Sequence, residues 1–204
     1  FTGIEPDDYY YFTIEAGGHI LAENAIFENM NEDGINIQAG ANVNQYYAFT
    51  NCWFRDGKPG PASVLLTIDC LHDLLIKNAV FFENTWGGDY NVRKTSTSGN
   101  IVFSDASGLF AGEAFEDDPN NQVHWLGYLE FEQSIDGFVV GSNMSHCFDA
   151  FNFLSVSGLV VHEGGDASLI AGQRIRILPG SHFHSGSTVR AYITTTFEFC
   201  EQPL

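Results

Sequence analysis

Carboxylates are the side chains in this sequence best suited to hold a metal ion. Glu116, Asp117 and Asp118 follow one another, with two asparagines a few residues later. Hard cations take clustered carboxylate and carbonyl oxygens, so this segment is predicted to bind calcium, the one cofactor that the sequence suggests. Neither an EF-hand loop nor the glycine-rich nonapeptide calcium repeat accompanies it.

Carboxylates are also the catalytic groups of glycoside hydrolases. Inverting enzymes need two carboxyls about 6.5 to 9.5 Å apart, which need not be neighbours in sequence. A polysaccharide lyase would need calcium and a basic proton acceptor, for which Arg93 and Lys94 are the candidates. With 26 acidic residues in the chain, no compact motif singles out one pair, so no catalytic residue is assigned. The pairs considered are Glu32 with Asp33, Asp69 with Asp73, and Asp136 with Asp149.

Two aromatic segments have a composition suited to binding a neutral sugar. Trp86 and Tyr90 flank a Gly-Gly-Asp turn that contains Asp89, and Trp125 lies further along the chain. Exposed aromatic faces stack on pyranose rings, while Asp accepts hydrogen bonds from hydroxyls. These four residues are therefore predicted to bind glycan. The alternative is that each ring folds back to cover the side of the fold.

Two histidines have the spacing of a metal pair. His182 and His184 are at i and i+2, so on a strand both point to the same face. No third ligand is evident nearby in the sequence. The segment from His162 to Asp166 resembles the zincin signature only superficially, because two glycines oppose the helix that this motif needs. The sequence indicates no metal-dependent catalysis.

Charge and hydropathy limit the partners. The formal net charge is −18, which repels nucleic acid, anionic membranes and acidic polysaccharides. Neutral glycans, cations and proteins remain as partners. No run of about 18 apolar residues is present, so no membrane insertion is expected. The chain begins at Phe1 without a basic, apolar leader, which we interpret as a processed product or a fragment.

An internal repeat indicates the fold that positions these residues. Four segments share the template Asn, two apolar residues, Phe, and they start at positions 24, 51, 78 and 100, which differ by 27, 27 and 22. About 22 to 27 residues suffice for three short strands and three bends. The segments are Asn24 to Phe27, Asn51 to Phe54, Asn78 to Phe81 and Asn100 to Phe103.

The repeat predicts an all-β, right-handed parallel β-helix with coils of about 22–27 residues. Its asparagines, Asn24, Asn51, Asn78 and Asn100, would stack as a hydrogen-bonded ladder, because side-chain amides pair along a column and tolerate bends. The template phenylalanines would stack inside. A sandwich of antiparallel hairpins is the alternative, but two-residue hairpin signals such as Asn-Gly are missing.

Residues 1–204 are expected to form one domain, because this length supports one sizeable core. The polar, Gly-rich stretch 84–128 is predicted as a loop-rich flank, and 168–204 as narrower terminal coils. Long loops on a rigid scaffold often carry specificity, so a binding site is expected on this flank. The four cysteines fit one or two disulfides as well as free buried thiols.

The stretch from Ser168 to Ile193 resembles a segment of large secreted and surface proteins exported by the type IX pathway. It contains an apolar alternation, Leu178-Pro179-Gly180, then Gly-Ser and Ala-x-Ile, with Ser181 where Phe is usual. The resemblance covers about an eighth of the chain. It implies that this stretch closes a β-solenoid and that the protein is extracellular or at the cell surface.

The residues and the resemblance together predict a non-catalytic β-solenoid module of a larger exported protein. Such a module would serve as a stalk, in adhesion, or in binding a glycan or protein at the cell surface. The alternative is a carbohydrate-active enzyme domain, a glycoside hydrolase or polysaccharide lyase with carboxylates on one sheet face.

Overall fold

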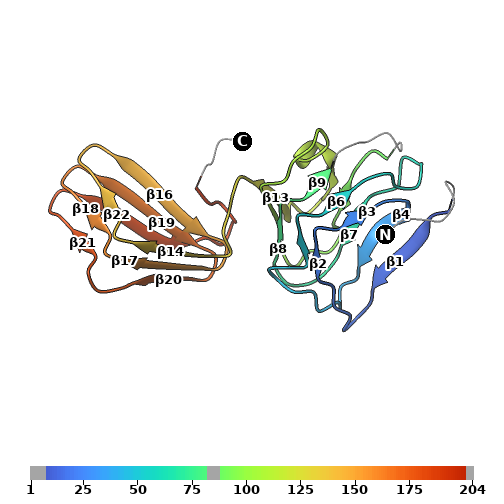
Figure 1. The fold of residues 1–204 in the computed structure, drawn as a ribbon, viewed down its shortest axis with the longest axis horizontal. Helices are drawn as coiled ribbons and strands as arrows, with labels where there is room; N and C mark the ends of the chain where they lie inside the picture. Colours follow the sequence, from blue (N-terminus) through green and yellow to red (C-terminus); the bar gives the residue numbers. More distant parts are fainter. Residues whose placement is uncertain (1–7, 82–87, 201–204) are drawn as a thin grey trace. The chain divides into compact units, whose positions relative to one another are not determined.

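The chain is an all-β solenoid of parallel strands, as the repeat predicts. The computed structural model describes residues 8–81 and 88–200, and its sheets run through successive coils (Figure 1). The described residues contain one short helical segment, the 3-10 turn η1 (Glu113–Phe115). No helix in the described ranges is long and apolar enough to cross a membrane.

The chain divides into two compact units, residues 1–127 and 128–204. Three parallel sheets build the first unit. In the order in which they pair, the first sheet has β1 (Tyr10–Ile14), β4 (Met30–Ile37), β7 (Leu66–Ile68), β10 (Val92–Arg93) and β12 (Glu116–Asp117). The second has β2 (Ala22–Glu23), β5 (Phe49–Thr50), β8 (Leu74–Lys77), β11 (Ile101–Ser104) and β13 (Val123–Leu126). The third has β3 (Ile26–Phe27), β6 (Trp53–Phe54) and β9 (Val80–Phe81).

The second unit has its own three sheets, which share no strand pairing with the first unit among the described residues. Its coils advance by 21 or 22 residues, as the pairs Val139↔Val160 and Val160↔His182 show. The three sheets are β14 (Glu132–Asp136), β17 (Phe153–Ser157) and β20 (Arg174–Ile177); β15 (Val139–Val140), β18 (Val160–Val161) and β21 (His182–Phe183); and β16 (Ser145–Ala150), β19 (Asp166–Ala171) and β22 (Thr188–Ile193).

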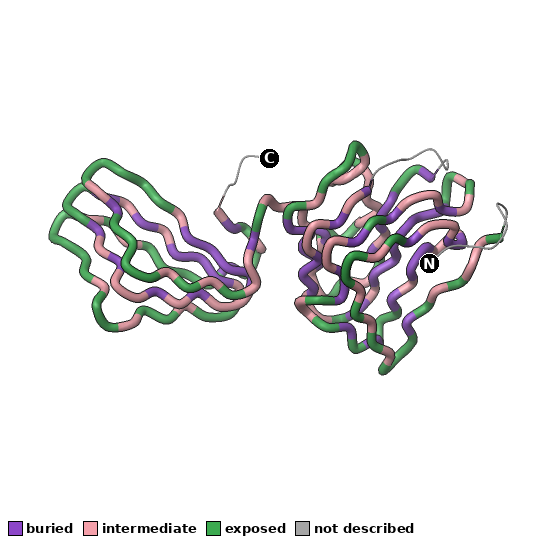
Figure 2. Tube along the Cα trace, in the orientation of Figure 1, coloured by how far each residue is buried: buried purple, intermediate pink, exposed green. Residues whose placement is uncertain are grey.

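The core of the first unit is a column of phenylalanines inside the coils. Phe27 pairs with Phe54 and Phe54 with Phe81, so the three rings repeat every 27 residues. The rings are fully buried and stacked, with centroids 5.5 and 5.4 Å apart. Phe103 is also buried but reaches Phe81 edge-on, at 5.7 Å, from a different sheet. Buried residues line the inner side of the strands in both units (Figure 2).

The asparagine ladder has three hydrogen-bonded members. Asn51 Nδ2 donates to Asn24 Oδ1 at 3.2 Å, and Asn78 Nδ2 donates to Asn51 Oδ1 at 2.7 Å. Each has φ near +53°, a left-handed conformation that Asn adopts more readily than most residues. The next residue of this column is Asp105, with φ 53°, which keeps the 27-residue spacing.

The placement of Asn100 in the ladder was wrong. Phe103 pairs with Ile76, so Asn100 aligns with Asp73, and its backbone N and its Nδ2 donate to Asp73 Oδ1 at 2.9 and 3.1 Å. The template therefore recurs as Asp105-Ala-Ser-Gly108. A Cβ on Gly108 would lie 2.1 Å from the Phe81 carbonyl oxygen, so no phenylalanine fits there.

The flank predicted as loop-rich, residues 84–128, continues the solenoid in its described part. It contains β10 to β13, and three of its polar residues, Asn91, Lys94 and Ser104, are fully buried. The narrower coils predicted for 168–204 begin earlier, at the start of the second unit.

One of the cysteine pairings left open by the sequence is present. Cys147 and Cys200 form a disulfide that links the start of the second unit's coils to the end of its chain, across 53 residues. Cys52 and Cys70 are free and buried in the first unit. Burial raises the pKa of the Cys70 thiol to about 11, so it is unreactive at neutral pH.

Replacing Phe54 by Ala should destabilise the first unit by about 3 to 5 kcal/mol, because it removes the middle ring of the column. Chemical denaturation measures the loss. Tyr11→Ala, at a side chain that is 76% exposed, is the control and should change stability by less than about 0.5 kcal/mol. A loss under about 1 kcal/mol for Phe54→Ala would contradict the column.

Replacing Cys147 and Cys200 together by Ser should lower the stability of the second unit by roughly 4 kcal/mol, from the loop-closure entropy of a 53-residue span. Urea unfolding in the absence of reductant gives the difference. Repeating it with a reducing agent should make the original protein and the variant equal. A difference that persists after reduction would assign the effect to the serines.

Candidate functional site

The three carboxylates predicted to bind calcium are directed to three different partners. Glu116 accepts a hydrogen bond from Trp125 Nε1, and Asp117 pairs with Arg93 Nε at 3.0 Å. Asp118 accepts from the backbone N of Val123 at 2.6 Å. Glu116 and Asp117 form strand β12, where successive side chains point to opposite faces. The predicted calcium site is therefore not assembled, and no group of three His, Cys, Asp or Glu in the described residues is arranged for a metal.

Trp125, predicted as a glycan platform, is half-buried and packs against the core wall. Its ring stacks on Phe103 at 4.2 Å and meets Phe81 edge-on at 5.7 Å. Asp89 and Tyr90 are exposed, the tyrosine at 39%. Trp86 lies outside the described residues.

The two candidate bases of a lyase both donate hydrogen bonds to other groups of the protein. Arg93 is held by Asp117 and by the carbonyl of Ala62. Lys94 is fully buried, and its Nζ donates to Ser96 Oγ at 2.7 Å and to the carbonyl of Ser98 at 3.0 Å. Burial lowers the Lys94 pKa. Lys94 Nζ also donates to the carbonyl oxygens of Ile68 and Cys70 in the preceding coil, each at 3.4 Å, so both residues link neighbouring coils.

The candidate carboxylate pairs also have structural partners. Asp69 accepts hydrogen bonds from the backbone N of Thr95 and Ser96, and Asp73 accepts from Asn100. The other partners are Lys58 for Glu32, Ser157 for Asp136, and the backbone N of Cys200 for Asp149.

The histidine pair has a neighbour that the sequence did not indicate. His184 stacks on His162 of the preceding coil at 4.8 Å, and His182 meets His184 edge-on at 4.6 Å. A 21- or 22-residue coil brings these positions into register, a signal that becomes readable only once the coil length of this unit is known.

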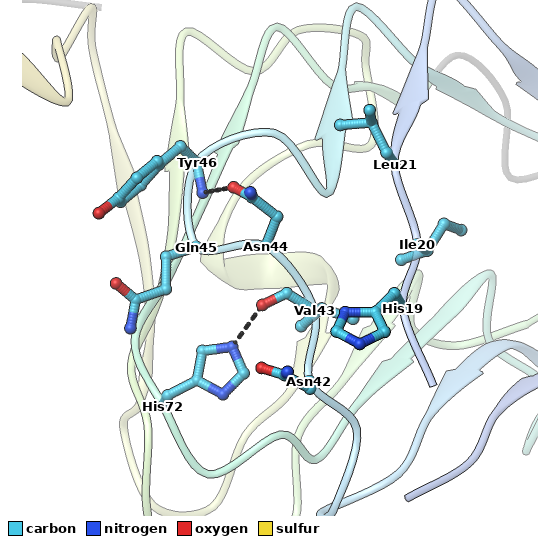
Figure 3. A pocket seen from close by; sticks show the side chains of 9 residues that line it. All are labelled: His19, Ile20, Leu21, Asn42, Val43, Asn44, Gln45, Tyr46 and His72. Atoms are coloured by element: carbon cyan, nitrogen blue, oxygen red, sulfur yellow. Dashed lines mark hydrogen bonds between the residues drawn. The ribbon is translucent and has the colours of Figure 1, made fainter. Parts of the chain in front are cut away.

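The candidate site is a pocket of about 740 Å³ at one corner of the first unit (Figure 3). Three connections form it, each between a strand of the first sheet and the next strand of the second sheet. They contribute residues 19–21, 42–46 and 72, from three successive coils. The middle connection, 38–48, is longer than 15–21 and 69–73 beside it, and this extra length forms a wall. The lining residues are His19, Ile20, Leu21, Asn42, Val43, Asn44, Gln45, Tyr46 and His72.

Hydrogen bonds and buried anchors fix this longer connection. Asn44 Oδ1 accepts from the backbone N of Tyr46 at 2.8 Å and of Tyr47 at 3.1 Å, which makes a local turn. Val43 is 2% exposed, and its carbonyl lies 2.9 Å from His72 Nε2. Because a carbonyl only accepts, Nε2 carries the hydrogen, which leaves Nδ1 of a neutral His72 as an acceptor.

The lining is polar without carrying a fixed charge. The amides of Asn42 and Gln45 both donate and accept hydrogen bonds, and the half-buried ring of Tyr46 adds an apolar surface. None of the nine lining residues, all of them described, is Asp, Glu, Lys or Arg. The pocket can therefore hold a neutral ligand rich in hydroxyls, and it offers no carboxylate pair for acid–base hydrolysis.

This pocket was not predicted from the sequence. The segment Asn42-Val-Asn-Gln-Tyr46 has the residue types of a sugar-binding loop, but it lies between segments of the repeat and outside the predicted binding flank, residues 84–128.

Comparison with known proteins finds no matching family model, curated protein or solved structure.

Glu116 gives a testable pH dependence. Burial raises its pKa from 4.5 to about 7, against the lowering effect of the Trp125 hydrogen bond. The folded state therefore binds this proton more tightly than the unfolded state does. Its contribution to stability is complete below pH 4.5 and is lost as the pH rises through about 7.

Glu116→Gln should remove this loss, because the amide oxygen still accepts from Trp125 and does not ionise. The difference in unfolding free energy between the variant and the original protein, measured from pH 4 to 8, should increase with pH in favour of the variant. Glu132→Gln, at an exposed position, is the control. A constant difference across this range would contradict a raised pKa.

Proposed function

We propose that this chain is a non-catalytic β-solenoid module of an exported protein, and that it binds a neutral glycan in the corner pocket. The observation that carries the proposal is the lining of that pocket, which combines amides, two imidazoles and a tyrosine without a fixed charge. Its volume of about 740 Å³ lies within the range of small-ligand sites.

The charge of the whole protein is consistent with a neutral ligand. At a formal net charge of −18, acidic polysaccharides are repelled, whereas neutral sugars are not. The enzyme alternative needs two carboxylates facing one cleft. The carboxylates that the sequence made candidates for this role instead accept hydrogen bonds from loops or form ion pairs between coils.

Location outside the cytoplasm is supported by two observations. The Cys147–Cys200 disulfide is typical of oxidising compartments. The second is the resemblance of Ser168 to Ile193 to type IX cargo, a stretch that spans the end of β19 and the strands β20, β21 and β22.

Binding should be detectable on an array of neutral oligosaccharides, followed by calorimetry with the best ligand. Tyr46→Ala should weaken binding about tenfold, because it removes the aromatic surface of the pocket. Tyr11→Ala, on an exposed tyrosine outside the pocket, is the matched control and should bind normally.

Two results would refute this proposal. One is equal affinity of Tyr46→Ala and the original protein, which would place the ligand elsewhere, with Asp89 and Tyr90 as the next candidates. The other is release of new reducing ends when the bound oligosaccharide is incubated with the protein, which would identify an enzyme.

A further inference from the structure

The last coil of the second unit leaves its inward-facing side chains uncovered. Ile177, Phe183 and Ile193 are 45%, 39% and 42% exposed. By strand register they stack on residues of the preceding coil that are fully buried: Val156, Val161 and Ala171. Each coil of a solenoid buries what its neighbour exposes, so the last coil has the surface of an interior coil.

This end also offers backbone hydrogen-bonding groups. The strands β20, β21 and β22 are each the last strand of their sheet, and the edge of a parallel sheet presents unpaired N–H and C=O groups. A hollow of about 530 Å³ lies between β20 and β22, lined by Ile175, Ile177, Ala191 and Ile193 among others.

The described chain beyond Ile193 does not cover this surface. Phe197 lies against Phe151, with ring centroids 6.1 Å apart, and Cys200 is bonded to Cys147 in β16. Strand β16 is at the opposite edge of its sheet from β22. Residues 194–200 therefore run back to the first coil of the unit.

The last coil of the second unit and the first coil of the first unit differ in charge. Arg174, Arg176 and Arg190 lie in the last coil, and residues 167–197 contain no acid. Residues 1–54 contain eight acids and neither Lys nor Arg. Two of these acids, Glu15 and Glu23, are exposed in or beside the first coil, whose strands β1, β2 and β3 each begin a sheet of the first unit.

We infer that the last coil of one molecule binds the first coil of a second copy of this chain, head to tail. This arrangement keeps the added strands parallel, since the sheets would continue in chain order from β20, β21 and β22 to the partner's first coil. It sets arginines against glutamates and covers the apolar hollow. A tail-to-tail dimer would set arginines against arginines.

Salt concentration should affect this contact in two ways. Copies with a net charge of −18 repel one another at low ionic strength, but at about 0.15 M salt charges further apart than roughly 8 Å are screened. Contacts between adjacent arginines and glutamates persist at that salt concentration.

The test is sedimentation velocity from 1 to 300 µM at about 0.15 M salt. The original protein should associate as its concentration rises. Arg176→Glu/Arg190→Glu and Glu15→Arg/Glu23→Arg should each be monomeric over this range, because each sets like charges together. An equimolar mixture of the two variants should associate again, because each basic end then meets an acidic one.

A second pair of variants tests the apolar part of the contact. Ile193→Asp should weaken association at least tenfold, whereas Leu71→Asp, at a position 56% exposed in a turn of the first unit, should not. A monomer at every concentration would overturn the inference. So would association that both charge-reversed variants retain, or a mixture that fails to recover it.

Discussion

The parallel hydrogen-bonded ladder between coils is the constraint from which the rest of the structure follows. It sets equivalent residues of neighbouring coils about 4.8 Å apart, so a side chain that suits one coil must also suit the coils on either side. Phe27, Phe54 and Phe81 meet this condition by stacking, and Asn24, Asn51 and Asn78 by amide hydrogen bonds. Gly108 ends the phenylalanine column because the Phe81 carbonyl occupies the space of a side chain. The rings of Phe103 and Trp125 then cover Phe81 from the adjacent sheet.

The same ladder explains why an acid-rich chain need not contain an acidic site. Bends between short strands leave backbone N–H groups without partners in the sheet, and a buried unpaired group is costly. Asp69 and Asp118 accept hydrogen bonds from such groups. Arg93 and Lys94 make the complementary contacts, donating to carbonyl oxygens of neighbouring coils. Hydrogen bonds to the backbone therefore account for the positions of these charged residues.

The period of the repeat could be found from the sequence because it is carried by identical residue types, Asn and Phe, at a constant spacing of 27. The fourth repeat was misaligned because a similar tetrapeptide, Asn100 to Phe103, precedes the true one, in which Asp105 keeps the left-handed bend and Gly108 replaces Phe. The left-handed backbone conformation recurs at this position of the repeat, although the residue there is Asp and not Asn. The pocket could not be found in this way, because it depends on which loops three different coils place at one corner.

A solenoid satisfies its interior residues by repetition, so its functional surfaces arise where repetition stops. In this chain the repetition is interrupted at the side of the coils by residues 38–48, a connection that is longer than its neighbours and forms a wall of the polar pocket. Along the solenoid axis it stops at β20, β21 and β22, whose apolar side chains are not covered by another coil of the described residues. The two surfaces differ in chemistry. The corner pocket presents amides and imidazoles, which suit a hydroxylated ligand. The last coil presents strand edges with arginines. A small ligand and a strand-bearing partner could therefore be bound at the same time by different parts of the same repeat.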